Sequence, residues 1–145
     1  MTSILLLSGP NLDELGIRSP EIYGTTSLDQ HVERSTALAQ QHGFTLVHLQ
    51  SNFEGELVEA IHAARGVHDA IIINPGALGH YSWSLRDALD AFPGTRIEIH
   101  LSNPAGREDF RRTSTLANVV NGTIAGFGSQ SYDLAVEAVA RLLSA

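Results

Sequence analysis

The chain has 145 residues, no cysteine and a formal net charge of −7 at pH 7, which suits one domain over 1–145 and excludes thiolate catalysis and cysteine-type zinc sites. The negative charge argues against nucleic acid as the main partner. The absence of a signal peptide, or of any apolar run near ~18 residues, predicts a cytoplasmic protein without membrane association. All nine basic residues are arginine, so a lysine imine is excluded.

The pattern of apolar and polar residues predicts strands that alternate with helices along the chain. We expect strands over Ser3–Ser8, Phe44–Leu49, Ala70–Ile73, Arg96–Leu101 and Val119–Phe127. We expect helices between Ser27 and Gly43, between Ser51 or Asn52 and Gly66, and over His80–Phe92, Arg107–Thr113 and Asp133–Leu143. This alternation predicts a parallel sheet with right-handed crossovers. Five strands in this length favour a flavodoxin-like, doubly wound α/β sheet in three layers, with strand order 2-1-3-4-5.

The connection Gly9–Gly24 is unusually long for a link between a strand and a helix. It has sixteen residues, whereas such links usually have about two to six. Long connections in compact domains are often functional lids or else disordered. The apolar residues in this one argue against disorder: Leu12, Leu15, Ile17, Ile22 and Tyr23. We therefore expect a lid that closes over a pocket, with a well-packed surface loop as the alternative.

Polar side chains follow the first, third and fourth predicted strands. They are Asn11, Asn74, His80, Glu98, His100 and Ser102. A doubly wound sheet binds its ligands at the carboxyl ends of the strands, so these residues are candidates for a site. Glu98 and His100 alternate along one strand and therefore share a face. A carboxylate beside an imidazole fixes its tautomer, as catalytic histidines require. A catalytic pair is one interpretation, and a solvated sheet edge is the other.

Two further pairs are ambiguous on spacing alone. His80 and Asp87 are seven positions apart in one predicted helix and share a face, but Asp87 could equally form a surface ion pair, and His80 could be a capping group. Arg107 and Arg111 are one helical turn apart and could bind a carboxylate together, or they could belong to a solvated basic face. The other histidines are scattered and give no metal-binding pattern.

Three segments of the chain, in this order, resemble the type II 3-dehydroquinate dehydratases. They are GPNLDELGIRSPEIYG at 9–24, NPGALGHYSWSLRDAL at 74–89 and EIHLSNPAGREDFRR at 98–112, with GTIAGFG at 122–128 extending the match. The resemblance implies a flavodoxin-like fold and an enzyme without cofactor or metal. It also implies a reaction, the trans-dehydration of 3-dehydroquinate to 3-dehydroshikimate through an enolate in the shikimate or quinate pathway. The assembly implied is a homododecamer of four trimers.

The resemblance also assigns catalytic roles to residues of this chain. Tyr23 is the base that removes a proton from C2 of the substrate. Arg18, in the same loop, favours the ionised tyrosine and stabilises the charge of the transition state. Asn11 holds a water that stabilises the enolate. His100, oriented by Glu98, is the acid that protonates the departing hydroxyl.

The same resemblance implies a set of residues that bind the substrate's hydroxyls and carboxylate: Asn74, His80, Leu101 and Ser102 (through their backbone) and Arg111. Asp87 matches a residue that reaches the substrate bound in a neighbouring subunit. Arg107 matches an arginine that contacts the lid.

Two other functions fit the same fold. A nucleotide or phosphate binder would need a hydroxyl-rich loop after the first strand, and Gly9–Leu12 has no such hydroxyls. A receiver-type interaction domain would need an acidic cluster after the first strand and a lysine after the last, and the chain contains no lysine. The sequence therefore favours the dehydratase.

Overall fold

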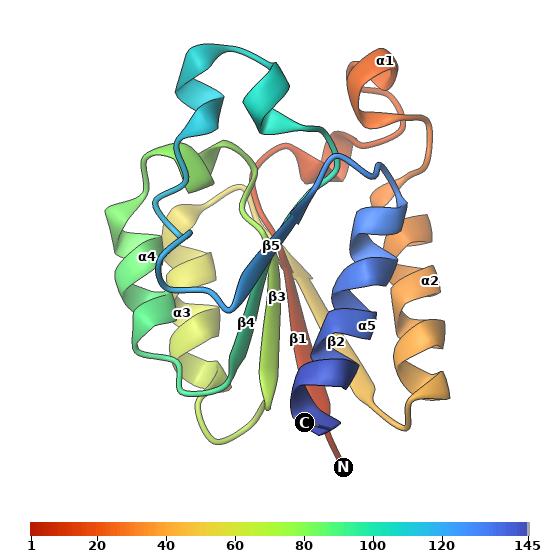
Figure 1. Cartoon of the computed structure of the whole chain (residues 1–145), viewed down its shortest axis with the longest axis vertical. Helices are drawn as coiled ribbons and strands as arrows, with labels where there is room; N and C mark the ends of the chain where they lie inside the picture. Colours follow the sequence, from red (N-terminus) through yellow and green to blue (C-terminus); the bar gives the residue numbers. More distant parts are fainter. Residues whose placement is uncertain (145) are drawn as a thin grey trace.

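The computed structural model describes residues 1–144, in which five parallel strands form a sheet of order β2-β1-β3-β4-β5 (Figure 1). The strands are β1 (Ser3–Ser8), β2 (Thr45–Gln50), β3 (Ala70–Asn74), β4 (Thr95–His100) and β5 (Gly122–Ala125). Each neighbouring pair runs parallel. The predicted flavodoxin-like, doubly wound sheet is confirmed. No helix within the described part is long and apolar enough to cross a membrane.

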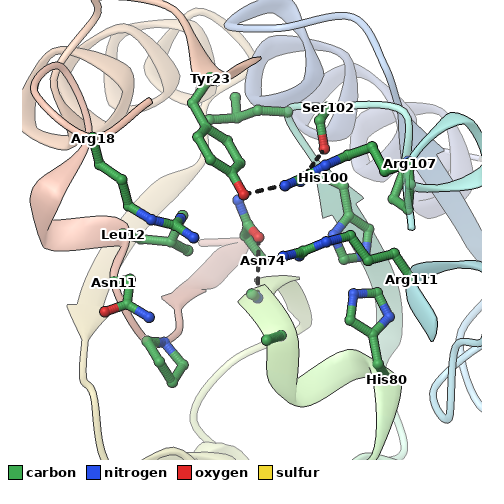
Figure 2. A pocket seen from close by; sticks show the side chains of 15 residues that line it. Asn11, Leu12, Arg18, Tyr23, Asn74, His80, His100, Ser102, Arg107 and Arg111 are labelled. Atoms are coloured by element: carbon green, nitrogen blue, oxygen red, sulfur yellow. Dashed lines mark hydrogen bonds between the residues drawn. The ribbon is translucent and has the colours of Figure 1, made fainter. Parts of the chain in front are cut away.

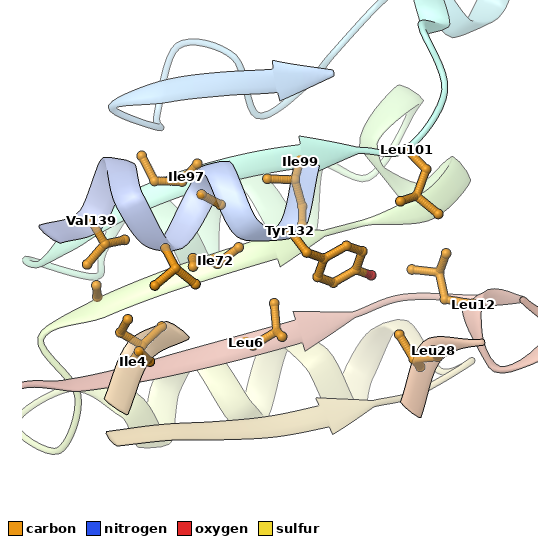
Figure 3. Close-up of a cluster of buried hydrophobic side chains, with 14 of the residues drawn as sticks. Ile4, Leu6, Leu12, Leu28, Ile72, Ile97, Ile99, Leu101, Tyr132 and Val139 are labelled. Carbon is orange, nitrogen blue, oxygen red and sulfur yellow. The ribbon is translucent and has the colours of Figure 1, made fainter. Parts of the chain in front are cut away.

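Helices cover both faces of the sheet. Figure 1 shows α2 (Leu28–Gln41) and α5 (Gln130–Ser144) on one face and α3 (Glu54–Ala64) and α4 (Trp83–Asp90) on the other. Alternate side chains of a strand point to opposite faces, so β1 supplies Ile4 and Leu6 to the cluster under α2 and α5 (Figure 3) and Leu5 and Leu7 to the cluster under α3 and α4. Burial on both faces explains the continuous apolar run of this strand.

The first long helix begins and ends where the sequence predicts. The Ser27 hydroxyl accepts a hydrogen bond from the Gln30 amide, and the Gln30 side chain accepts one from the Ser27 amide, which is a complete capping box. Gly43 follows the helix with a φ of 78°, a conformation that glycine adopts without strain.

Several predicted boundaries are wrong, and α5 begins at Gln130 rather than at Asp133. Helix α3 begins after Phe53 rather than after Ser51 or Asn52, because the Ser51 hydroxyl accepts from the Phe53 amide at 2.9 Å and holds the turn that precedes the helix. The fifth strand is shorter than the predicted Val119–Phe127, since the apolar side chain of Val119 is buried in a loop under α3 and α4 rather than in the sheet.

The predicted helix His80–Phe92 is instead a 3-10 helix, η2 (Gly76–His80), followed by α4. The Ser82 hydroxyl accepts from the Leu85 amide at 3.0 Å and starts the new helix. Trp83, the first residue of α4, is 67% exposed. The predicted helix over Arg107–Thr113 is replaced by a 3-10 helix, η4 (Asp109–Arg112), and a second 3-10 helix, η3 (Pro104–Gly106), precedes it.

Candidate active site

A cavity of about 60 Å³ opens at the carboxyl edge of the sheet, beneath the connection Gly9–Gly24 (Figure 2). It is lined by ten of the twelve residues singled out above, all except Glu98 and Asp87: Asn11, Arg18, Tyr23, Asn74, His80, His100, Leu101, Ser102, Arg107 and Arg111. Residues far apart in the sequence therefore meet where a doubly wound sheet places its ligand. The long connection forms one wall of a cavity, as the lid hypothesis requires.

The lid begins at Gly9, where the backbone is in close contact with the backbone at Asn74 and Pro75. The Gly9 amide donates to the Asn74 carbonyl at 2.8 Å, and a β-carbon at Gly9 would lie 2.5 Å from the carbonyl oxygen of Pro75. Only glycine fits this contact between the end of β1 and the end of β3. Next to it, the Asn11 amide donates to the Asn52 side chain at 2.9 Å, which places Asn11 at the cavity.

The first and second halves of the lid are held differently. Leu12 and Leu15, around η1 (Leu12–Glu14), are buried in the core under α2 and α5. By contrast, α1 (Pro20–Tyr23) contains no buried residue, and Ile17 and Ile22 are exposed, contrary to the expectation that they would pack. The lid is therefore anchored firmly through its first half only.

The hydroxyl of Tyr23 lies between two arginines. Arg107 donates to it at 2.9 Å and also to the Ser102 hydroxyl at 3.1 Å, and both bonds are drawn in Figure 2. The Arg18 guanidinium lies 4.7 Å from the centre of the tyrosine ring, and that of Arg107 lies 5.1 Å from it. Two positively charged groups therefore lie beside the phenol of Tyr23.

The side chains of Glu98 and His100 lie within hydrogen-bond distance of each other and are largely shielded from solvent. The Nε2 of His100 is 2.6 Å from Oε2 of Glu98, and the two side chains are 11% and 1% exposed. A carboxylate at this position accepts the Nε2–H hydrogen bond and fixes the tautomer of the ring. The alternative of a solvated sheet edge is wrong, because the carboxylate is buried.

His80 and Asn74 are each held by a hydrogen bond from outside the cavity. The Nδ1 of His80 lies 2.8 Å from the Thr113 carbonyl, which accepts from it, and its ring stacks on His100 with centroids 6.2 Å apart. The Asn74 side-chain amide donates to the hydroxyl of Tyr132 at 3.3 Å. Burial raises the pKa of Tyr132, so this phenol stays neutral. His80 is not a helix cap.

Arg111 and Arg107 both line the cavity. Arg111 pairs with the exposed Glu108, and the hydrogen bond from this arginine lowers the pKa of the glutamate. The helical turn predicted between the two arginines is absent, because Arg107 follows η3 and Arg111 lies in η4.

Asp87 lies apart from the cavity. Its side chain is 74% exposed and pairs with Arg86 at 2.9 Å. It does not share a helix face with His80, because His80 belongs to η2. The surface ion pair that the sequence left open is present.

Two hydroxyls beside the site were not anticipated: that of Tyr132, which is buried, and that of Ser114, which is half-buried. Tyr132 contacts Asn74, and Ser114 donates to Oε1 of Glu98 at 2.8 Å. In the sequence, Tyr132 cannot be distinguished from the other apolar residues of the amphipathic helix α5, and Ser114 lies in a segment without regular secondary structure. Neither position carries a local signal in the sequence.

The fold and the cavity define a class of protein, an α/β enzyme that performs acid–base chemistry on an anionic molecule. A phenol flanked by cations is suited to take a proton, and an imidazole bound to a buried carboxylate is suited to give one. Three arginines at the cavity suit a carboxylate. In residues 1–144 no group of three or more acidic or histidine side chains is placed to hold a metal ion.

The family model for class II dehydroquinases matches residues 2–140. The 3-dehydroquinate dehydratase of Ruegeria pomeroyi is 51% identical over 99% of this chain and 97% of its own length. A catabolic 3-dehydroquinase of Phaeosphaeria nodorum is 48% identical, covering 96% of this chain and 91% of its own. The crystal structure of type II dehydroquinase from Propionibacterium acnes superimposes with a TM-score of 0.93 at 39% identity, covering 97% of each chain.

The chain belongs to the class II dehydroquinase family. The resemblance seen in three sequence motifs is confirmed, and with it the choice of a dehydratase over a nucleotide binder or a receiver domain.

Proposed function

We propose that this protein dehydrates 3-dehydroquinate to 3-dehydroshikimate, without a cofactor, by trans elimination through an enolate. The observation that carries the proposal is the cavity in which a phenol between two arginines lies across from a Glu98–His100 pair. The names of the relatives support the substrate, since the similar proteins from Ruegeria pomeroyi and Phaeosphaeria nodorum are a 3-dehydroquinate dehydratase and a catabolic 3-dehydroquinase. The pathway is that of shikimate or quinate.

In this mechanism Tyr23 is the base that takes a proton from C2 of the substrate. A free tyrosine loses its proton near pH 10, so ionising it at pH 7 costs about 4 kcal/mol. One guanidinium at ~4 Å stabilises an anion by about as much at an effective dielectric constant of ~20. Arg107 donates to the phenol oxygen at 2.9 Å, and Arg18 lies 4.7 Å from the centre of the ring, so two arginines lie close enough to act on Tyr23 in this way.

The carbanion formed at C2 is delocalised onto the ketone oxygen as an enolate, which Asn11 stabilises through a bound water. The hydroxyl at C1 then leaves as water, with a proton from His100. One proton is taken by Tyr23 and one is given by His100, so the overall reaction releases only water. The base is on the lid and the acid on β4, and a substrate between them loses its proton and its hydroxyl from opposite faces.

The remaining residues of the cavity bind the substrate. Arg111, with Arg107 beside it, suits the carboxylate, whereas Asn74, His80 and the backbone at Leu101 and Ser102 suit the hydroxyls. A ligand pocket usually measures about 300–1,000 Å³, and this cavity has about 60 Å³. We therefore infer that the lid moves outward to admit the substrate.

The test is an ultraviolet assay for the conjugated enone product, with Tyr23→Phe as the decisive variant. Loss of a general base typically lowers a rate about 10²–10⁴-fold, so we expect kcat to fall by at least a hundredfold while the substrate still binds. Tyr81→Phe is the matched control, because Tyr81 is 62% exposed and does not line the cavity. A Tyr23→Phe enzyme that keeps more than a tenth of kcat would show that another group is the base.

The elimination geometry has its own test. Stereospecifically deuterated 3-dehydroquinate should lose the C2 label that is trans to the C1 hydroxyl, and borohydride added with substrate should leave activity intact, because the chain has no lysine to form an imine. Retention of the trans label would contradict the mechanism.

We also propose that the protein acts in the cytoplasm as a homododecamer of four trimers, in which residues 1–145 form one catalytic domain. The supporting observation is that Asp87 is 74% exposed and away from its own cavity, which suits contact with substrate in a neighbouring subunit. Gel filtration should give a particle far above the monomer mass of 15.6 kDa, and Asp87→Asn should lower activity without dissociating it. An active monomer would contradict both the assembly and the role of Asp87.

A further inference from the structure

The carboxylate of Glu98 has two oxygens, and each has a different partner. Oε2 accepts from Nε2 of His100 at 2.6 Å, and Oε1 accepts from the Ser114 hydroxyl at 2.8 Å. The glutamate side chain is 1% exposed. A buried carboxylate is costly unless its oxygens are hydrogen-bonded. The hydrogen bond from Ser114 therefore helps to hold the Glu98 carboxylate beside His100.

The direction of the Ser114 hydrogen bond is fixed by a second contact. The Leu116 amide donates to the Ser114 oxygen at 3.2 Å, and an amide cannot accept in return. A hydroxyl has one proton to give, so the proton of Ser114 points to Glu98. Leu116 is fully buried under α3 and α4, which holds this arrangement in place.

The backbone on either side of Ser114 is bonded to the segment that carries His80. The Thr115 amide donates to the Gly79 carbonyl at 2.8 Å, and the Thr113 carbonyl lies 2.8 Å from Nδ1 of His80. The Thr115 hydroxyl adds a bond to the Ser82 carbonyl at 3.2 Å. Residues 113–115 therefore place Ser114 at a defined position against the glutamate, and a shift of this segment would move both histidines of the cavity.

We propose that Ser114 is a positioning residue that completes a chain of hydrogen bonds, Ser114–Glu98–His100, and thereby orients the acid of the reaction. The hydroxyl holds Glu98 in the rotamer that faces His100. The glutamate in turn binds Nε2 of His100 and leaves Nδ1 for the substrate. The chemical role of His100 rests on the proposed function, whereas the chain of hydrogen bonds does not.

The test compares Ser114→Ala with Ser114→Thr. Threonine keeps the hydroxyl, and Ser114 borders a second cavity of about 180 Å³ that offers room for the added methyl group. Ser35→Ala is the control, because it removes a serine hydroxyl that has no hydrogen-bond partner within residues 1–144 and lies on α2 outside the cavity. Urea unfolding of each variant establishes that it is folded under the assay conditions.

The first readout does not need activity. In proton spectra of the protein labelled with ¹⁵N-histidine, the Nε2 proton of His100 should appear at low field, as expected for a short bond to a carboxylate. We expect the signal to move or disappear in Ser114→Ala and to persist in Ser114→Thr and Ser35→Ala. An unchanged signal in Ser114→Ala would overturn the proposal even if the wild type proved to have no dehydratase activity.

The second readout is kinetic. We expect Ser114→Ala to lower kcat about tenfold with KM changed less than twofold, and Ser114→Thr to restore most of the loss. Ser114→Thr keeps the hydroxyl that donates to Glu98, whereas Ser114→Ala removes it. If Ser114→Thr lost as much of kcat as Ser114→Ala, the serine would be merely structural and the proposal would be overturned.

Discussion

Tyr23 shows how a neighbour distant in the sequence changes the assignment of a role. The resemblance gives the activation of this tyrosine to Arg18, five positions away in the same lid. In the structure, Arg107 donates directly to the phenol oxygen, whereas Arg18 lies over the ring. A hydrogen bond to a charged group contributes about 1.5–3 kcal/mol, so Arg107 should contribute at least as much as Arg18 to holding a phenolate.

We therefore predict that Arg107→Ala lowers kcat about 10–100-fold, in keeping with the loss of one charge-assisted hydrogen bond. Arg107→Lys should recover part of the loss, since it keeps the charge but not the fork that also reaches Ser102. Arg65→Ala is the control, because this arginine is exposed and does not line the cavity. Steady-state kinetics with the enone assay measures all three. If Arg107→Ala kept more than half of kcat, Arg18 would be the sufficient cation.

At the scale of elements, the lid has one fixed half and one loosely held half. Leu12 and Leu15 bury the first half in the core, whereas α1 carries Tyr23 without burying any residue. The lid ends at Gly24, whose φ of 81° and ψ of −176° lie in a region that is essentially restricted to glycine. A base carried by such an element can reach the substrate only when the lid closes.

Gly24→Ala should therefore impair catalysis more than it impairs folding. A β-carbon at Gly24 meets no atom within 4 Å, so the cost is the backbone strain alone, about 1–3 kcal/mol. We expect kcat/KM to fall about 5–100-fold, with a small change in the thermal midpoint. Gly43→Ala is the matched control, because Gly43 has a similar φ of 78° and equally open surroundings but ends α2, at the opposite edge of the sheet. It should lose stability and keep kcat/KM. The reverse pattern would show that the lid does not depend on this conformation.

The whole molecule contains an acid-sensitive group in its core. His31 is 1% exposed, stacks on Tyr132 at 4.9 Å, and has no hydrogen-bond partner for either ring nitrogen within the described residues. Burial, with a smaller contribution from Arg34, lowers the pKa of His31 to about 4. Burial likewise lowers the pKa of His48. Both imidazoles are therefore neutral in the folded protein at neutral pH.

Because the folded-state pKa of His31 lies below its unfolded value of 6.5, its contribution to stability is complete above pH 6.5 and is lost as the pH falls toward 4. The unfolded chain then binds a proton that the folded chain excludes, which amounts to about 2 kcal/mol at pH 5. His31→Phe keeps an aromatic ring that can stack on Tyr132 but has no group that binds a proton. Urea unfolding at pH 7 and pH 5 should show a smaller loss of stability in the variant. An equal loss in both proteins would assign the acid sensitivity to other groups.

Much of the fold follows from local patterns. Helix α2 begins after Ser27 as predicted, where Ser27 and Gln30 form a capping box, and the apolar run Ser3–Ser8 is buried on both faces. The boundaries failed where a polar side chain took an unexpected partner: Ser51 bonds a turn instead of capping α3, and Ser82 starts a helix in the middle of the predicted His80–Phe92. Sequence patterns show which local structure a few neighbouring residues prefer. Where two helix starts are almost equally preferred, the hydrogen bond of a serine side chain decides which one forms.

The sequence by itself determined the strand order and, through three motifs, the family and all but a few of the residues that meet in the cavity. Such residues follow strand ends, and strand ends converge in this fold. The resemblance already implied that Arg107 contacts the lid, but only the tertiary structure decided that it donates to the phenol oxygen of Tyr23 and that Ser114 contacts Glu98. These contacts join residues from separate elements, so their geometry depends on how the elements pack and not on the residues next to each of them in the chain.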